Sequence, residues 1–460
     1  MEELDSLSPL DGRYSKIIEP LTKFFSEKSL MQYRIKVEAE YLIALSEIDV
    51  TRKFTEIEKI ILRSLQYLLN PQAEIIKKIE KEGYNNIKAT NHDVKAIEYY
   101  MKEQLKNTSL DDCLEKIHFG LTSEDVNNMA YSLMLSDALE KVMIPKLEDL
   151  MDSLLMFSQK YKSLPMLART HGQPASPTTL GKEFKVYYSR LENQWRQLNS
   201  CWITAKLNGA TGNYNALHFA YPKIDWICFS NKFINSFNDK RKIKLCPNNH
   251  TTQIESHDSY AELFDNLNRT NTILIGLSQD MWRYISDGWL VQKPKDGEIG
   301  SSTMPHKVNP IDFENSEGNL SMANALFSFF SSKLPISRLQ RDLSDSTVLR
   351  NIGSAFGYSL IGYSSLTKGF SKIAPDENKI KEELNNHPEI ISEGIQTILR
   401  REGCTKPYEQ LMQLTRGKKV TLQDIYSFID TLQIPDNIKT ELKKITPENY
   451  IGLAEKLADY

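Results

Sequence analysis

Apolar residues recur at three- and four-residue steps along several long stretches of the chain, which is the period of an α-helix. The clearest stretch begins near Ser259, and its apolar positions are Tyr260, Leu263, Phe264, Leu267, Leu274, Leu277, Met281 and Ile285. Residues 122–161, 310–332 and 344–370 also predict long helices. Several of these helices carry few charges on any face, so other helices must bury them. The pattern predicts an all-α fold with a central bundle of long helices that other subunits complete.

Glycine and proline gather in a few places, which leaves the rest of the chain free to form helices. Only short strands are predicted, for example around residues 243–245. Composition divides the chain into three predicted domains, residues 1–115, 116–367 and 368–460. The last of these is charged and is interrupted by Pro375, Pro388, Pro407 and Pro435. The charge run at 238–242 predicts a solvated loop, and it lies in a basic stretch, residues 235–250, whose role stays open.

The composition narrows the class of protein. The chain has 460 residues, of which 40% are hydrophobic and 25% charged, and its net charge is only −3. This balance excludes disorder and argues against nonspecific binding of nucleic acid. The cysteines are dispersed without a CxxC pair, which predicts reduced thiols rather than disulfides or a zinc site; they are Cys113, Cys201, Cys228, Cys246 and Cys404. The acidic start and the lack of a long apolar run predict a cytoplasmic protein that does not enter a membrane.

The most informative segment runs from residue 300 to 310 and reads Gly-Ser-Ser-Thr-Met-Pro-His-Lys-Val-Asn-Pro. Small residues followed by prolines cannot continue a helix, so this segment is predicted to be a loop. Backbone N–H groups in a Gly-Ser-Ser turn can hold a carboxylate, and Lys307 adds a positive charge. Gly-Ser-Ser alone would also fit a flexible linker, but the full string does not.

This string resembles the signature loop of the fumarase/aspartase superfamily. Residues 170–175, Thr-His-Gly-Gln-Pro-Ala, resemble the superfamily segment that carries a catalytic histidine. Four more stretches, 8–14, 90–95, 251–255 and 341–350, resemble the adenylosuccinate lyase family in its longer bacterial form. The resemblance implies a three-domain, all-α lyase whose long helices form a tetrameric core. It also implies release of fumarate from adenylosuccinate and from succinylaminoimidazole carboxamide ribotide, two steps of purine nucleotide biosynthesis, without a cofactor.

The implied reaction is an anti β-elimination that breaks a C–N bond. A base must take a proton from the carbon beside a carboxylate, and an acid must protonate the departing nitrogen. By resemblance, Ser301 is the base and His171 is the acid, and the ordinary pKa of histidine suits the acid role. Glu314 resembles the carboxylate that orients the histidine of a neighbouring subunit, although an acidic residue in a first helical turn also fits the helix dipole.

The substrate contacts are also implied by resemblance. Asn91 and Ser123 are predicted helix caps, and helix N-termini offer N–H groups to anions, although plain capping is the alternative. Ser346 and Arg350 are four residues apart and share one helix face. Together with Arg341 and the Arg13–Tyr14 pair they can surround a phosphate, and the motif matches favour this role over a solvated surface for Arg13, Arg341 and Arg350. The implied substrate-binding residues are Arg13, Tyr14, Asn91, His92, Asp93, Thr122, Ser123, Gln253, Lys307, Asn309, Arg341, Ser346, Thr347, Val348, Leu349 and Arg350.

Two alternatives remain open on the sequence. Another superfamily lyase, such as argininosuccinate lyase, fumarase or aspartase, would share the signature loop but does not need the phosphate-binding set. A noncatalytic helical scaffold would keep the core helices while its loops drift, and the intact His171, Ser301 and Asn309 speak against it. No histidine pair has metal-ligand spacing, so no metal is expected, and His306 is treated as a family marker. We expect nucleotide substrates and a homotetramer with shared active sites, and neither nucleic acid nor a membrane as a partner.

Overall fold

The computed structural model describes residues 3–293, 304, 307–417 and 419–460. The chain forms two compact units, each assembled from three separate segments. Unit 1 contains Met1–Leu147, Gln194–Thr272 and Gly318–Ser364, and unit 2 contains Glu148–Asn193, Ile273–Glu317 and Ser365–Tyr460. The predicted domain boundaries at 115 and 367 stay a prediction, because these units divide the chain in another way.

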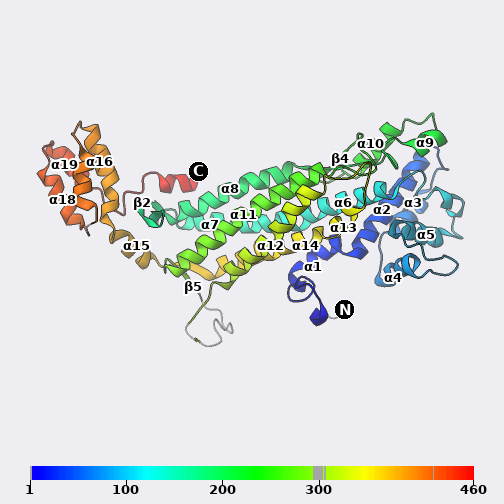
Figure 1. Ribbon diagram of the computed structural model, residues 1–460, viewed down its shortest axis with the longest axis horizontal. Helices are drawn as coiled ribbons and strands as arrows, with labels where there is room; N and C mark the ends of the chain where they lie inside the picture. Colours follow the sequence, from blue (N-terminus) through cyan, green and yellow to red (C-terminus); the bar gives the residue numbers. More distant parts are fainter. Residues whose placement is uncertain (1–2, 294–303, 305–306, 418) are drawn as a thin grey trace. The chain divides into compact units, whose positions relative to one another are not determined.

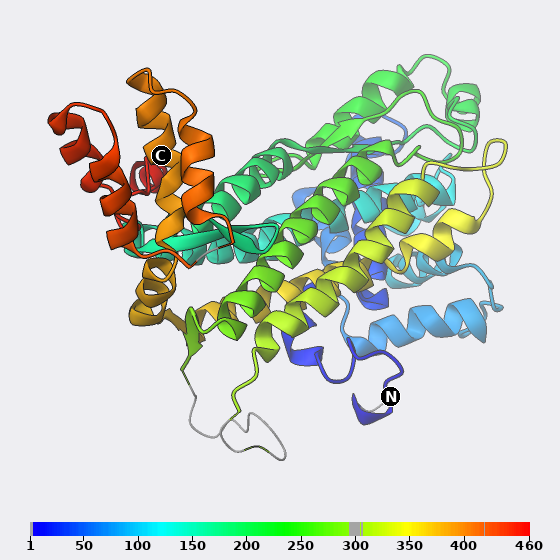
Figure 2. The same ribbon diagram turned by 60° about the vertical axis from the view of Figure 1, so that its left-hand side comes forward.

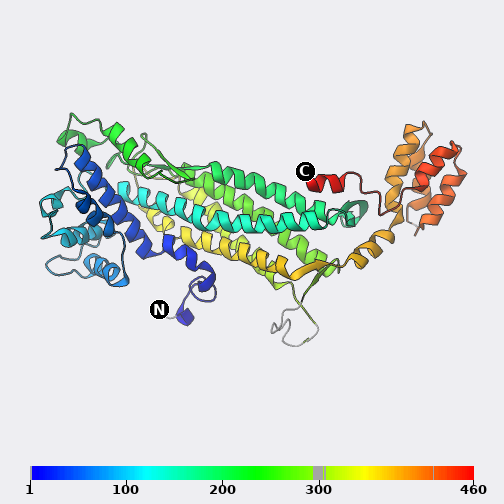
Figure 3. The same cartoon turned by 180° about the vertical axis from the view of Figure 1, so that it is seen from behind.

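Five long helices supply residues to both units, and their lengths account for the discontinuous segments. They are α7 (Ile144–Lys160), α8 (Leu180–Ser200), α11 (Asp258–Ser286), α12 (Ile311–Lys333) and α14 (Ile352–Lys372). Within each unit, the parts of these helices that belong to it run alongside one another in all three views (Figure 1, Figure 2 and Figure 3). The prediction of a mostly helical fold with a central bundle of long helices is confirmed.

Contacts within each unit pack these helices together. In unit 1 the rings of Phe264 and Phe327 stack at 5.6 Å, which joins α11 to α12. The Tyr363 hydroxyl donates to Asn271 at 2.8 Å and joins α14 to α11. In unit 2 the rings of Phe157 and Phe370 lie 5.6 Å apart and join α7 to α14. The apolar period in the sequence thus becomes the interior of a helical bundle.

The N-terminal part of unit 1 is organised around α2 (Glu27–Glu47). One side of α2 buries Ile35 and Leu42 in a cluster with the helices that follow it. Another side buries Tyr41 and Leu45 in a second cluster with α6 and α10. The remaining helices of this part are α1 (Ser15–Phe25), α3 (Glu56–Ser64), α4 (Asn70–Lys81), α5 (Asp93–Leu105), α6 (Ser123–Ala138), α9 (Asn215–Ala220), α10 (Trp226–Ser236) and α13 (Ser344–Leu349).

Unit 2 ends in a set of short helices with its own apolar core. These helices are α15 (Glu377–Asn385), α16 (Ser392–Arg401), α17 (Pro407–Thr415), α18 (Leu422–Thr431), α19 (Asp436–Lys443) and α20 (Ala454–Asp459). Ile395, Ile425 and Leu442 are fully buried within this core. Pro388 and Pro407 each stand in the first turn of a helix, a position where proline is favourable, so they begin helices rather than break them.

Strands are few and short in the described part of the chain. β1 (Pro165–Thr170) and β2 (Gln173–Thr179) form an antiparallel hairpin, and β5 (Leu290–Gln292) pairs with β6 (Ile373–Pro375). β3 (Trp202–Ala205) pairs in parallel with β4 (Lys244–Pro247), which matches the strand predicted around residues 243–245. No helix in the described ranges has both the length and the apolar character needed to cross a membrane.

Three local predictions need correction. The helix predicted over 344–370 is interrupted at residues 350–351, between α13 and α14, where Asn351 N–H donates to the Val348 carbonyl at 2.9 Å. The N-caps of α5 and α6 are His92 and Thr122 rather than Asn91 and Ser123. Cap positions one residue apart are hard to separate by sequence because both neighbours carry polar side chains.

The charge run at 238–242 is also not wholly solvated. Arg241 keeps only 11% of its side chain exposed and donates to Asp137 at 2.8 Å. Asp137 lies in the last turn of α6, so the pair fixes this loop to the end of that helix. A local run of charges does not reveal a carboxylate that lies about a hundred residues earlier in the chain.

Candidate functional site

Two helix starts of unit 1 meet at the side chains of His92 and Ser123. His92 caps α5, and its Nδ1 accepts from the Lys95 N–H at 3.2 Å. In the neutral imidazole the proton therefore lies on Nε2, which is 3.4 Å from the Ser123 hydroxyl oxygen. The His92 side chain is half exposed, so this proton donor and the start of α6 face the same open surface.

Asp93 connects the α5 start to two arginines. Arg34 and Arg350 place their Nη2 atoms 2.9 and 2.7 Å from Asp93 Oδ2. Burial alone would raise the pKa of the Asp93 carboxyl, but the neighbouring Arg34 and Arg350 guanidinium groups lower it to about 2. Arg34 is itself buried and also donates to Asn127 of α6 at 2.8 Å. This network holds Arg350, one of the implied phosphate ligands, at a fixed place beside α5.

Arg341 is the centre of a second cluster in unit 1. Its Nη1 donates to Gln253 Oε1 at 3.2 Å, and its Nη2 lies 3.4 Å from Glu124 Oε2. Burial raises the pKa of Glu124 to about 7 despite the nearby positive charge of Arg341. Two implied substrate-binding residues, Arg341 and Gln253, are thus in direct contact, although 88 residues separate them in the chain.

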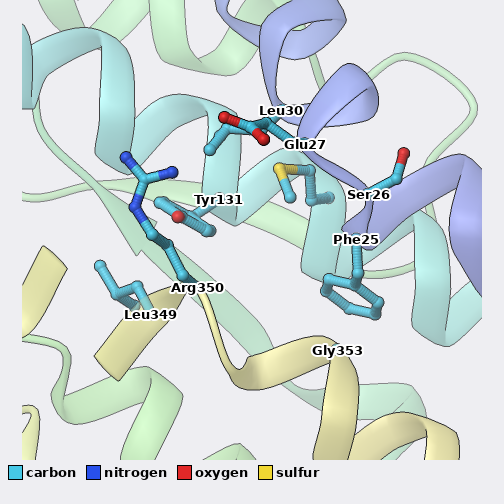
Figure 4. Close-up of a pocket in the computed structure, with 9 residues that line it drawn as sticks. Phe25, Ser26, Glu27, Leu30, Tyr131, Leu349, Arg350 and Gly353 are labelled. Carbon is cyan, nitrogen blue, oxygen red and sulfur yellow. The ribbon is translucent and has the colours of Figure 1, made fainter. Parts of the chain in front are cut away.

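A pocket of about 210 Å³ lies against Arg350 (Figure 4). Figure 4 shows the Arg350 guanidinium beside the Tyr131 ring, and burial raises the pKa of that tyrosine. The lining residues are Phe25, Ser26, Glu27, Leu30, Tyr131, Met134, Leu349, Arg350 and Gly353. A pocket of this volume is smaller than a typical small-molecule site, so it provides room for one group of a ligand rather than for a whole nucleotide.

The other implied ligands of unit 1 lie on neighbouring elements. Ser346, Thr347 and Val348 belong to the short helix α13, directly before Leu349. Tyr14 is the N-cap of α1, and the Arg13 guanidinium lies 5.9 Å from the centre of the Tyr14 ring. Asn91 takes a left-handed backbone with φ 48°, which turns the chain into the α5 start.

His171 stands at the tip of the β1–β2 hairpin in unit 2. Thr170 pairs with Gln173, so His171 and Gly172 form a two-residue turn, and their φ angles are 52° and 74°. Positive φ at both positions defines a type I′ turn, the turn that matches the twist of a hairpin. The turn leaves the His171 side chain exposed at the end of the hairpin. Such a histidine can act only on a molecule brought to that tip.

Lys307, Asn309 and Glu314 lead into and begin α12 in unit 2. Lys307 is exposed and Asn309 is partly buried. Glu314 lies in the first turn of α12, and its Oε1 accepts from the Trp282 indole N–H at 3.1 Å. Ser301 and His306 lie outside the described residues. Across the ranges that the structure describes, no group of three or more His, Cys, Asp and Glu side chains is arranged to hold a metal ion.

Sequence reasoning missed several residues of these clusters. Arg34 was one of them, although a lone arginine between the apolar residues Met31 and Ile35 is a signal for a buried charge that needs a partner. Glu124, which lies in the first turn of α6, was another. Lys206 carried no local signal at all, yet its side chain is fully buried.

Comparisons with known proteins agree along the whole chain. Residues 12–324 match the lyase family model, and residues 337–451 match the model of the adenylosuccinate lyase C-terminal domain. Adenylosuccinate lyase from Dictyostelium discoideum is 49% identical, with 98% of this chain and 97% of that protein covered. The enzyme of the same name from Haemophilus influenzae is 48% identical, with 100% and 99% covered.

Solved structures show the same fold at low sequence identity. A fumarate lyase from Mesorhizobium sp. BNC1 superposes with a TM-score of 0.75 at 15% identity, covering 96% of each chain. The 3-carboxy-cis,cis-muconate lactonizing enzyme from Pseudomonas putida gives a TM-score of 0.71 at 17% identity, covering 96% of this chain and 95% of that one. At this level of identity the likeness concerns the fold alone.

Proposed function

The chain belongs to the adenylosuccinate lyase family, and from this membership we infer that it is a C–N lyase that removes fumarate from adenylosuccinate to leave AMP. By the same elimination it releases fumarate from succinylaminoimidazole carboxamide ribotide. The observation that carries the proposal is the similarity to adenylosuccinate lyases over the full length, at 49% and 48% identity. A noncatalytic helical scaffold whose loops had changed would not be expected to keep such similarity together with the residues that the reaction needs.

The reaction requires a base, an acid and donors for the charge that builds on the carboxylate. We assign the acid to His171, whose exposed position on a hairpin tip leaves the imidazole open to a substrate. Ser301 is assigned as the base. Lys307 and Asn309, which precede α12, are assigned to the succinyl group, and its carboxylate also meets the start of α6 at Thr122 and Ser123.

The nucleotide end of the substrate is assigned to the arginine clusters of unit 1. Arg341, held by Gln253 and Glu124, and Arg350, held by Asp93, supply forked donors that suit a phosphate. Ser346–Arg350 and the Arg13–Tyr14 pair complete this set, and His92 is placed near the scissile bond. Argininosuccinate and fumarate carry no phosphate, so these clusters favour a nucleotide over the substrates of the other superfamily lyases.

The active sites are proposed to be shared among the subunits of a homotetramer in the cytoplasm. Long helices such as α11 and α12 supply the surfaces for such a core. Glu314 of one subunit would then orient the His171 of another. Glu314 Oε1 accepts from the Trp282 indole N–H, and we assign the second carboxylate oxygen to this role.

The direct test is the loss of adenylosuccinate ultraviolet absorbance on addition of the purified protein. We expect turnover with adenylosuccinate and none with argininosuccinate or fumarate assayed side by side. A flat trace at micromolar enzyme would favour a noncatalytic scaffold, and turnover of argininosuccinate alone would move the protein to another branch of the superfamily.

A further inference from the structure

The most deeply buried ion pair of unit 1 joins Lys206 to Asp125. Lys206 Nζ lies 3.0 Å from Asp125 Oδ1, and both side chains have no exposed surface. The same Nζ donates to the Gly209 carbonyl at 3.0 Å and to the Gln253 carbonyl at 2.7 Å. An ammonium has three protons to donate, and here each has an acceptor. All three ammonium protons of Lys206 are therefore used within the protein, and Lys206 is not a ligand for the substrate.

Asp125 connects this lysine to the start of α6. Its Oδ2 accepts from the Thr122 N–H at 2.9 Å, and its Oδ1 accepts from the Asn208 N–H at 3.0 Å. The Gly209 N–H lies 3.1 Å from Oδ2. The carboxylate therefore fixes the turn that presents Thr122 and Ser123, and it joins this turn to the segment 206–209.

Gln253 carries the connection to the arginine cluster. Its carbonyl accepts from Lys206, and its own N–H donates to the Gln340 carbonyl at 3.2 Å. Its side-chain oxygen accepts from Arg341 Nη1 at 3.2 Å. One buried ammonium therefore lies between the α6 start on one side and Gln253 with Arg341 on the other.

A buried ion pair contributes little to stability when its desolvation cost is counted, so its value depends on what it holds in place. We propose that Lys206 is a positioning residue that keeps the α6 start and the Gln253–Arg341 pair at the separation that a bound substrate requires. This inference rests on the proposed function, which assigns the α6 start to the succinyl carboxylate and Arg341 to the phosphate. Misplacement of such groups by about 1 Å can lower a rate by about 100-fold.

The test replaces Lys206 by methionine, which keeps a long unbranched side chain and removes the ammonium. We expect kcat/KM for adenylosuccinate to fall by about 100-fold. Inhibition by both fumarate and AMP should weaken, because the two segments lose their common anchor. Thr122→Ala, which alters only the α6 start, should weaken inhibition by fumarate alone.

A matched control lies at the other end of the same helix. Arg241 pairs with Asp137 of α6 as Lys206 pairs with Asp125, and its side chain is also mostly buried. Arg241→Met should lower the melting temperature as much as Lys206→Met does and leave kcat/KM unchanged. Equal losses of kcat/KM in the two variants would mean general destabilisation and would overturn the proposal, as would wild-type kinetics in Lys206→Met.

Removal of one partner leaves a buried charge without its counterion, which can prevent folding. The double variant Lys206→Gln with Asp125→Asn removes both charges and keeps polar groups at both positions. We expect it to fold and to show the same joint weakening of fumarate and AMP inhibition. Full activity in this folded double variant would refute the positioning role. Failure of the wild-type protein to turn over adenylosuccinate would instead refute the proposed function.

Discussion

At the scale of single residues, the site of unit 1 depends on charges that are buried beside an accessible surface. Glu124, Arg341 and Asp345 are all largely buried, and Glu124 Oε1 and both Asp345 oxygens make no hydrogen bond within the described residues. Arg341 is the cation that lies nearest to both carboxyl groups. Without a ligand, these buried groups lower the stability of the folded state. Such destabilising arrangements are common at sites that bind a substrate.

The raised pKa of Glu124 predicts how stability depends on pH. Burial raises this pKa from an ordinary 4.5 to about 7, so the folded state holds a proton that the unfolded state releases between these values. The contribution of Glu124 to the free energy of unfolding is therefore fully present below pH 4.5 and is lost as the pH rises through 7. This contribution is at most about 3 kcal/mol. Urea unfolding from pH 4.5 to 8 should show this decline, and Glu124→Gln should reduce it.

The control for this prediction is Glu19→Gln, because Glu19 is an exposed residue of α1. Its unfolding free energy should follow the wild-type pH dependence. An equal pH dependence in Glu124→Gln and the wild type would show that the Glu124 carboxyl does not hold the proton.

If Arg341 binds the phosphate as proposed, Arg341→Ala should weaken the binding of adenylosuccinate and AMP by about 2 kcal/mol, or roughly 30-fold, because it removes a charge-assisted contact. The contact exists in the ground state and in the transition state, so KM should rise while kcat stays near its original value. Steady-state kinetics and AMP inhibition measure both quantities. Arg338→Ala is the control, since Arg338 is 82% exposed and pairs with the nearby Asp342. A fall in kcat alone would contradict the phosphate assignment.

At the scale of elements, function depends on where helices and turns begin. α5 and α6 start at His92 and Thr122, so their N-terminal N–H groups and their capping side chains gather on one surface of unit 1. The β1–β2 hairpin places His171 at its tip because a type I′ turn accepts a histidine in the left-handed region, where it is favoured over most residues. Gly172 follows it in the same region without strain.

Gly172→Ala should lower turnover at the hairpin tip. An alanine at φ 74° costs about 1 kcal/mol and shifts the turn that carries His171. Apart from its two chain neighbours, no residue that the structure describes has an atom within 4 Å of an added methyl group at this position, so the effect comes from the backbone. Gly403 has φ 76° and equally open surroundings, so Gly403→Ala is a matched control. Both variants should lose the same stability, and only Gly172→Ala should lose kcat; equal kcat values would contradict a role for the tip.

At the scale of the whole molecule, five long helices supply residues to both compact units. Their buried faces are explained by contacts such as Phe264 with Phe327 in unit 1 and Phe157 with Phe370 in unit 2. Exposed apolar residues remain on the same helices, among them Met322 and Phe329 of α12. These residues fit the proposed homotetrameric core, since exposed apolar faces on bundle helices are covered when subunits assemble.

If the active sites are shared between subunits as proposed, two inactive variants should complement each other. His171→Ala and Ser301→Ala should each form folded, nearly inactive oligomers, because the first side chain is exposed and both changes remove the proposed proton-transfer groups rather than core volume. Mixing the two after subunit exchange should restore part of the activity, since some sites then combine an intact histidine with an intact serine. Each variant exchanged with itself is the control. Confirmed mixed oligomers without recovered activity would exclude shared sites.

The helical period and the placement of glycine and proline were enough to predict the long helices. Both signals are local, because each residue affects the conformation of its own helical turn. The starts of α11 and α12 and the strand near residue 244 were predicted for this reason. The motif strings identified the family and the implied ligands His92, Gln253 and Arg341 as separate points along the chain. The interruption at 350–351 was missed, because neither Arg350 nor Asn351 is a glycine or a proline, the residues that most clearly mark a break.

Only the tertiary structure decided which of these points meet. The contact of Arg341 with Gln253, the pairing of Arg34 and Arg350 with Asp93, and the burial of Lys206 against Asp125 all join residues far apart in the sequence. Local spacing carries no information about such partners, because burial and charge pairing depend on which helices pack together. The chain alone therefore revealed the elements and the chemical groups, and the folded bundle selected the neighbours that set their charge and position.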